Sequence, residues 1–191
     1  MFKLVRLMAM IPVLLAAVAC SSMNPSTSAS ASGSSRPELE QKARAAYKTL
    51  VETTPKAAEL GTHATAVLIF PDILKAGFLV GAKEGDGVMF GPDGKVMGYY
   101  NATALSYGLQ AGAQTFHQAM FLMTPAALNY LNSSDGWSVG VGPSVVVIDE
   151  GKAKSMTTTT MQSDVYAFIY GQEGLMAGAG VQGQKITKIK P

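Results

Sequence analysis

The sequence predicts an α+β fold, in which an N-terminal amphipathic helix packs on a strongly curved, mostly antiparallel and glycine-rich sheet that can close partly into a barrel. Three observations predict it. A strong helical period of apolar residues runs from Pro37 to about Glu59. After Gly61 the chain changes to short β-type runs separated by glycine. Glycines also recur two residues apart, which leaves one strand face bare and lets a sheet curl. These pairs stand at positions 85 and 87, 140 and 142, and 178 and 180.

The first 19 residues have the pattern of a signal peptide. Lys3 and Arg6 precede an uncharged apolar run that ends in small residues. A spanning helix needs roughly 20 apolar residues, and this run is shorter and contains Pro12. We therefore expect a cleaved signal rather than a retained transmembrane helix.

Cys20 is the expected lipidation site. The run from Leu15 to Cys20 resembles the lipobox of bacterial lipoproteins, whose cysteine is acylated, with palmitate as a typical chain; Ala17 stands where that pattern usually has leucine. A chance thiol beside an ordinary cleavage site is the alternative. Cys20 is the only cysteine and cannot form an internal disulfide, which favours lipidation. By resemblance to the sorting rule of Gram-negative lipoproteins, Ser21 favours the periplasmic face of the outer membrane.

The expected domain organisation is a signal peptide over residues 1–19, a flexible tether over 20–36 and one folded domain over 37–191. The tether is rich in Ser, Thr, Ala, Asn, Pro and Gly, and cannot bury enough apolar surface to fold. The folded part, about 155 residues, is long enough for a sizeable core. Removing Lys3 and Arg6 from the 15 basic residues leaves 13, equal to the 13 acidic ones. This balance argues against a nucleic-acid partner.

The elements of the folded part follow from local patterns. The helix has polar residues opposite its apolar stripe, begins after Ser34 or Ser35 and breaks near Pro55. A turn at 91–94 joins the two sides of a hairpin. The other expected elements are strands over Ala66–Phe70, Gly77–Gly81 and Trp137–Ile148, a mixed stretch over Ala104–Met123, a helix over Pro125–Leu131, and three final strands over Asp164–Tyr170, Gly174–Gln182 and Gln184–Ile189.

Three blocks of residues, in order, resemble the SYLF lipid-binding domain family. They are 66–71 with 75–78, then 108–114, and then 170–178. The similarity extends across roughly Ala45 to Ile189. The family occurs in bacterial lipoproteins and in eukaryotic membrane-trafficking proteins, some of which bind actin. The resemblance implies a lipid-binding, non-catalytic domain. Residues 99–104 and 157–160 depart from the family pattern, which leaves the function of those loops open.

No motif in the sequence predicts an enzyme, a metal site or a cofactor. Gly178–Gly183 has the spacing of a dinucleotide-binding loop, but an alternating strand follows it instead of a helix, so we expect a tight β-turn. His63 and His117 lack further ligands at metal spacing, and we expect His117 to be a packed or rim residue. A lipid hydrolase is the least favoured alternative. Its candidate groups are His117 and the turn carboxylates Asp72, Glu84, Asp86, Asp149, Glu150 and Glu173.

Lipid binding requires an apolar surface for acyl chains and cations for phosphate. The apolar candidates are Met120 and Met123, within a run that core packing also explains. The cationic candidates are Lys75, Lys83, Lys185 and Lys188, which can equally be surface residues for solubility. We expect an envelope lipoprotein, held at the membrane by its N-terminal lipid, whose domain binds phospholipid or another amphiphile. The alternative is a protein-interaction module with an unidentified partner.

Overall fold

The computed structural model describes residues 35–133, 136–149 and 162–190. All of them belong to one compact unit, Gly33–Pro191. Cys20, the signal peptide and nearly all of the expected tether lie outside the described residues, as do Glu150 and the 157–160 run.

Two helices form the start of the described chain. α1 spans Arg36–Thr53 and α2 spans Pro55–His63, which confirms the expected break at Pro55. Ser35 occupies the N-cap position but its side chain makes no capping hydrogen bond. α2 continues through Gly61, where a helix end was predicted. Gly61 packs closely against Tyr47, where a Cβ would overlap the tyrosine hydroxyl, so this glycine serves the packing of the helix rather than its end.

Three long antiparallel strands replace the many short strands that the sequence predicts. β1 spans Ala66–Phe90, β2 spans Val96–Leu122 and β5 spans Val165–Ile189. Pro71 and Gly77 do not end a strand, because β1 passes them with register shifts while its pairing with β2 continues. The three final strands predicted from the sequence are likewise one strand, since β2 provides pairing partners from Leu122 to Tyr99.

The sheet has the order β1-β2-β5-β3, and β4 also pairs with β5. β3 (Trp137–Ser138) is antiparallel to β5, whereas β4 (Val145–Asp149) is parallel to it. The predicted strand over Trp137–Ile148 is therefore wrong in its middle part. Gly140 and Gly142 have positive φ angles of 99° and 91° there. They turn the chain between β3 and β4, which pair with different parts of β5. The hairpin turn is confirmed by the Gly94 N–H, which donates to the Gly91 carbonyl at 2.9 Å.

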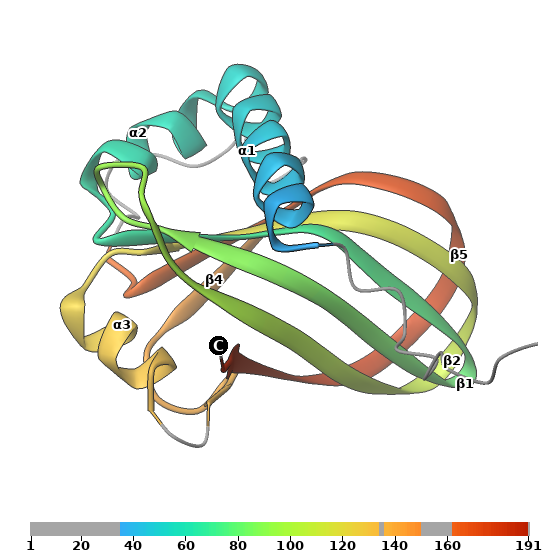
Figure 1. Ribbon diagram of the computed structural model, residues 1–191. Helices are drawn as coiled ribbons and strands as arrows, with labels where there is room; N and C mark the ends of the chain where they lie inside the picture. The colour runs from blue at the N-terminus through green and yellow to red at the C-terminus, as the bar shows by residue number, and fades with distance from the viewer. Residues whose placement is uncertain (1–34, 134–135, 150–161, 191) are drawn as a thin grey trace, which may run out of the picture. The chain divides into compact units, whose positions relative to one another are not determined.

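Each long strand bends back on itself, so that the sheet forms a half-barrel (Figure 1). Leu79 has a φ of +61° at the bulge in β1, and glycines with positive φ lie at the bend in the other two strands. A Cβ on Gly112 of β2 would overlap the Leu175 carbonyl of β5. The predicted role of the glycine pair at 85 and 87 is confirmed, because a Cβ on Gly85 would lie 2.7 Å from the Asp72 carbonyl oxygen in the first half of the same strand.

The predicted turn at Gly178–Gly183 is wrong. β5 runs straight through these residues, with Gly180 opposite Gly108 and Gly183 opposite Leu105 in β2. The equal length of the neighbouring strand explains this continuity, since β2 provides a pairing partner for each residue of β5 from Gly178 to Gly183. The α+β class and the strong curvature of the sheet agree with the prediction.

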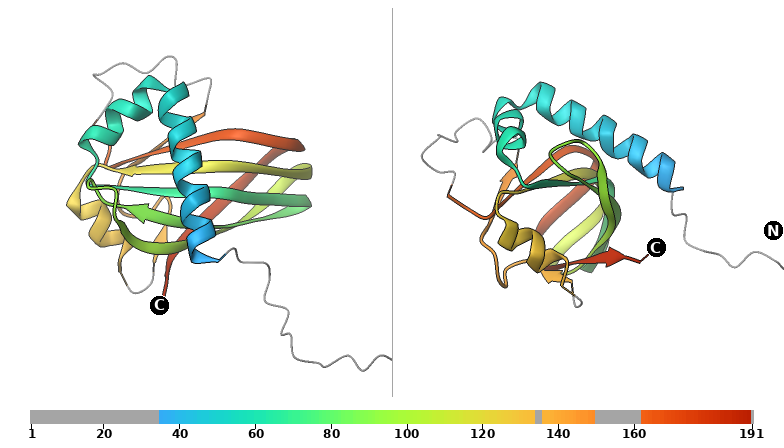
Figure 2. Two further views of the ribbon diagram at one scale, coloured as in Figure 1. Left: turned by 45° about the horizontal axis from the view of Figure 1, so that its top comes forward. Right: turned by 60° about the vertical axis from the view of Figure 1, so that its left-hand side comes forward.

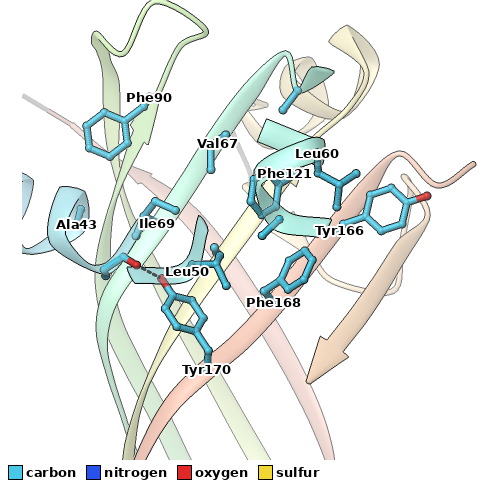
Figure 3. Packing of buried hydrophobic residues seen from close by; sticks show 14 of the residues in the cluster. Ala43, Leu50, Leu60, Val67, Ile69, Phe90, Phe121, Tyr166, Phe168 and Tyr170 are labelled. Carbon is cyan, nitrogen blue, oxygen red and sulfur yellow. Dashed lines mark hydrogen bonds between the residues drawn. The ribbon is translucent and has the colours of Figure 1, made fainter. Parts of the chain in front are cut away.

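At the end away from the bend, apolar side chains are buried on both faces of the sheet. α1 and α2 cover the convex face there, as Figure 2 shows, and Figure 3 shows their contact with the strands. Phe121 and Phe168 pack edge to face at 5.5 Å between ring centroids, and the Tyr170 hydroxyl donates to the Ala46 carbonyl of α1 at 3.0 Å. On the concave face, α3 (Pro125–Leu131), predicted correctly, packs with Trp137 against a second cluster. The helices thus leave the bend uncovered.

Candidate functional site

The bend carries an exposed apolar surface, which we call the bend crest. Its large side chains are between 47 and 88% exposed. They are Leu74, Phe78, Leu79, Val80, Leu105, Tyr107, Leu109 and Leu175.

The sheet register places the bend crest on the convex side. Val80 lies directly opposite Tyr107, and directly opposite residues in a ladder point to the same face. Leu105 and Leu109 are each two residues from Tyr107 along β2 and share that face. The intervening Ser106 is buried on the other face. The alternation therefore separates an apolar outer surface from a polar interior.

Charged residues are scarce around the bend crest. β2 contains no Asp, Glu, Lys or Arg in its 27 residues. In β5 none occurs between Glu173 and Lys185. An exposed apolar surface of this kind is typical of a contact with a membrane or with another protein.

The concave face becomes polar towards the bend. Lys83 is only 4% exposed there, and its Nζ donates to Gln118 Oε1 at 3.0 Å and to Gln184 Oε1 at 3.1 Å. The ammonium also lies 5.2 Å from the centre of the Phe116 ring. Among the described carboxylates, none forms an ion pair with Lys83. Burial lowers the pKa of Lys83 to about 8, and the positive charge of Lys75 adds to this effect.

Two cavities meet at Lys83. Their volumes are about 510 Å³ and about 200 Å³, and both are lined by Lys83, Val139 and Gln184. Glu84 and Lys185, both exposed, also line the larger cavity. The remaining apolar residues of the smaller cavity are Met120, Val145, Val147, Ala167 and Ile169. A cation thus lies beside an apolar wall within the half-barrel.

A third cavity, of about 410 Å³, lies between α1 and the hairpin turn. Arg44 borders it, with its guanidinium 4.6 Å from the centre of the Phe90 ring and a hydrogen bond of 3.1 Å to the Gly94 carbonyl. Arg44 therefore has partners of its own in the fold.

The six candidate residues from the sequence lie in different places. Lys83 and Met120 line the smaller cavity, and Lys83 and Lys185 line the larger one. Lys75 is half-buried on the concave face, opposite Gln114. The other two candidates lie elsewhere: Lys188 donates to Asn132 at 3.1 Å, and Met123 packs against the cluster beneath the helices.

Sequence reasoning missed the bend crest, Gln118 and Gln184. The signal for the crest was available, because residues 105, 107 and 109 are large and apolar within a long uncharged segment. For the two glutamines no such signal exists, since a glutamine in a strand has the same local pattern whether it faces a cation or water.

The described residues hold no group of three or more His, Cys, Asp or Glu side chains placed to bind a metal ion. His117 is half-buried, its Nδ1 contacts the Pro71 carbonyl, and its ring lies 5.2 Å from the Tyr170 ring. Two of the candidate carboxylates also have structural partners. Asp86 accepts a hydrogen bond from Asn101 at 2.8 Å, and Asp72 lies 3.4 Å from Lys42. No described helix is both long and apolar enough to cross a membrane.

Comparison with known protein families finds a similarity over the C-terminal half of the folded part. Residues 103–190 match the model of the Ysc84 family, described as Las17-binding protein actin regulator. No match was found among curated proteins. The matched segment contains β5, most of β2, and both glutamines that bind Lys83. The description names binding and regulation rather than a reaction. Residues 103–190 of the chain are thus similar to the Ysc84 (SYLF) family, which is consistent with a SYLF-domain protein.

Proposed function

We propose that this protein is a non-catalytic, membrane-tethered lipoprotein whose folded domain contacts the surface of a phospholipid bilayer through the bend crest. The observation that carries this proposal is the exposure of eight large apolar side chains on one bend of the sheet, whose middle strand β2 carries no charged residue. Exposed groups of this kind gain free energy when they leave water, at about 25 cal/mol per Å² of apolar surface.

The shape and composition of the bend crest favour a bilayer as the partner. A bend presents a convex edge, which can enter the headgroup region without displacing the rest of the domain. Phe78, Tyr107 and Leu109 are each at least 75% exposed. Aromatic rings combined with aliphatic side chains are typical of surfaces at the membrane interface. Glu173 and Lys185 flank the uncharged part of β5 and would remain among the headgroups.

An N-terminal anchor would make even a weak bilayer contact effective. The anchor proposal rests on the sequence pattern at Cys20 and places the protein in the cell envelope, at the periplasmic face of the outer membrane. A flexible tether over residues 20–36 would hold the domain at a root-mean-square distance of roughly 20–25 Å from its attachment point. Such proximity raises the effective concentration of the bend crest at the bilayer.

Vesicle flotation tests the bilayer contact. Both apolar clusters are formed by residues of the folded unit, so a chain of residues 21–191 retains the whole core and lacks the expected signal and lipid. We expect this chain to float with phosphatidylcholine–phosphatidylglycerol vesicles and the variant F78S/L109S to lose most of that binding. The matched control M97S/V141S replaces two apolar side chains that are 44% and 62% exposed outside the bend crest. Equal flotation of both variants, or none by the parent chain, would contradict the proposal.

A protein partner is the second candidate, because the matched family is described as Las17-binding. The same apolar surface could dock a protein. Photocrosslinkers placed at Phe78 and at Met97 distinguish the two. A single protein captured in high yield from Phe78 alone, by a chain that does not float with vesicles, would favour the protein-interaction module.

A further inference from the structure

Lys83 is the most unusual feature of the concave face, because it is a buried cation that forms no ion pair with the carboxylates the structure describes. Burying an ammonium group is costly unless it is paired and hydrogen-bonded. Lys83 has two neutral amide acceptors and an aromatic ring, but no ion pair among the described residues. The half-buried Lys75 adds positive charge to the same face.

We propose that the two cavities around Lys83 bind an anionic single-chain amphiphile, with its carboxylate or phosphate headgroup on the Lys83 ammonium and its acyl chain along the apolar wall. An ammonium has three N–H donors, and Gln118 and Gln184 accept two of them. No hydrogen bond from the third donor to a described residue is present, and this donor can bind a ligand oxygen. The bond would be charge-assisted on both sides and therefore strong in a buried site.

The apolar wall lies on the correct side for an acyl chain. Met120, Val145, Val147, Ala167 and Ile169 line the smaller cavity together with Lys83. The larger cavity, of about 510 Å³, continues from Lys83 past Val139 to the exposed Lys185 and Glu84 and provides an entrance. Cavities of roughly 300–1,000 Å³ with apolar walls and few polar groups are typical of small-molecule sites. The space suits one chain of medium length rather than a two-chain phospholipid.

The interior site goes beyond the bilayer contact proposed above and does not depend on it. Lys83 faces the concave side, opposite Ala104, whereas Val80 and Tyr107 face the convex side. Leu105 of the bend crest also lines the larger cavity, but Phe78 and Leu109 line neither cavity. The variant F78S/L109S can therefore lose the bilayer contact while the interior site still binds.

Isothermal titration of the 21–191 chain tests the interior site with four probes, and the three amphiphiles among them are kept below their critical micelle concentrations. Laurate and dodecyl phosphate carry an anion and a chain, dodecyl maltoside carries the chain alone, and acetate carries the anion alone. We expect one laurate or dodecyl phosphate to bind per chain, and the stronger of the two identifies the headgroup. Dodecyl maltoside and acetate should bind at least about tenfold more weakly. Comparable affinity for dodecyl maltoside, or no binding of either anionic amphiphile, would overturn the proposal.

Two variants locate the binding at Lys83. K83M removes the cation, and Q184E places a carboxylate at the position of the amide that now accepts from it at 3.1 Å. Both should weaken binding of the anionic probe at least about tenfold. K95M is the control, since Lys95 lies in the hairpin turn with its side chain 84% exposed. Q184E adds a partner for the buried cation, so it remains informative if K83M does not fold. Unchanged affinity in either folded variant would show that the amphiphile binds elsewhere.

Discussion

The ammonium of Lys83 lies 3.0 Å from Gln118 Oε1, across the concave face of the sheet, although the two residues are 35 positions apart in the chain. This contact joins β1 to β2 and fixes a cation inside the half-barrel. It brings the polar interior of the bend next to the apolar core that contains Met120. Among the described residues, the partners of this buried charge are two neutral amides and the Phe116 ring, which has measurable consequences.

The stability of the protein should depend on pH through Lys83. Its pKa in the folded chain is about 8, below the ordinary value of 10.5. Between these values the unfolded chain binds more protons, so the free energy of unfolding rises with pH. From pH 7.5 to 9.5 the parent chain should gain about 1–2 kcal/mol relative to K83M, measured by urea unfolding. Parallel pH profiles for the two chains would show that Lys83 has an ordinary pKa.

The bend should require glycine at position 112. Gly112 has a φ of +129°, and a Cβ there would overlap the Leu175 carbonyl of β5. We expect G112A to lower the free energy of unfolding by about 2 kcal/mol or more, because backbone strain and overlap add together. G183A is the matched control, since a Cβ on Gly183 meets no atom within 4 Å. A loss of less than about 0.5 kcal/mol in G112A, equal to the control, would mean that the bend tolerates a side chain.

The hydrogen bond from Tyr170 should hold α1 on the sheet. Its hydroxyl is buried and donates to the Ala46 carbonyl at 3.0 Å, and burial raises the pKa of Tyr170. Y170F should lower the free energy of unfolding by about 1 kcal/mol. The loss stays this small because the Ala46 carbonyl, within α1, keeps its hydrogen bond along the helix. Y107F, at a tyrosine that is 75% exposed, should cost almost nothing. If both variants were as stable as the parent chain, the buried hydroxyl would contribute nothing to docking.

Cys20 should determine membrane attachment in the cell. We expect the full-length protein expressed in a Gram-negative host to fractionate with membranes and to have the mass of an acylated chain that begins at Cys20. C20S should leave an unacylated protein that is released from the outer membrane fraction. Mass spectrometry of the purified N-terminal peptide provides the measurement. An unmodified Cys20 in the mature protein would contradict lipidation.

Local patterns predicted the helices well and the strands only in part. Pro55 and the apolar stripe of α1 depend on neighbours within one or two turns, which a sequence displays directly. The passage of β1 through Pro71 depends on pairing with Phe116 and Gln118, far along the chain. Register shifts absorb the proline, so a residue that normally ends a strand instead bends it.

The candidate site was predictable at single residues but not as an arrangement. Lys83 and Met120 were both named from composition, yet their common cavity arises only when each long strand folds back on itself. The two glutamines that hold Lys83 carry no local signal, and their role follows from register alone.

Penetration of the bend crest into a bilayer tests the central proposal most directly. In the 21–191 chain, the only natural tryptophan, Trp137, is fully buried and gives a constant background. With vesicles, the variant F78W should shift its emission to the blue and be quenched by lipids brominated on their acyl chains. M97W, outside the bend crest, should show neither change. If the emission of F78W stayed that of a water-exposed tryptophan and were quenched no more than M97W, the bend crest would not enter the bilayer.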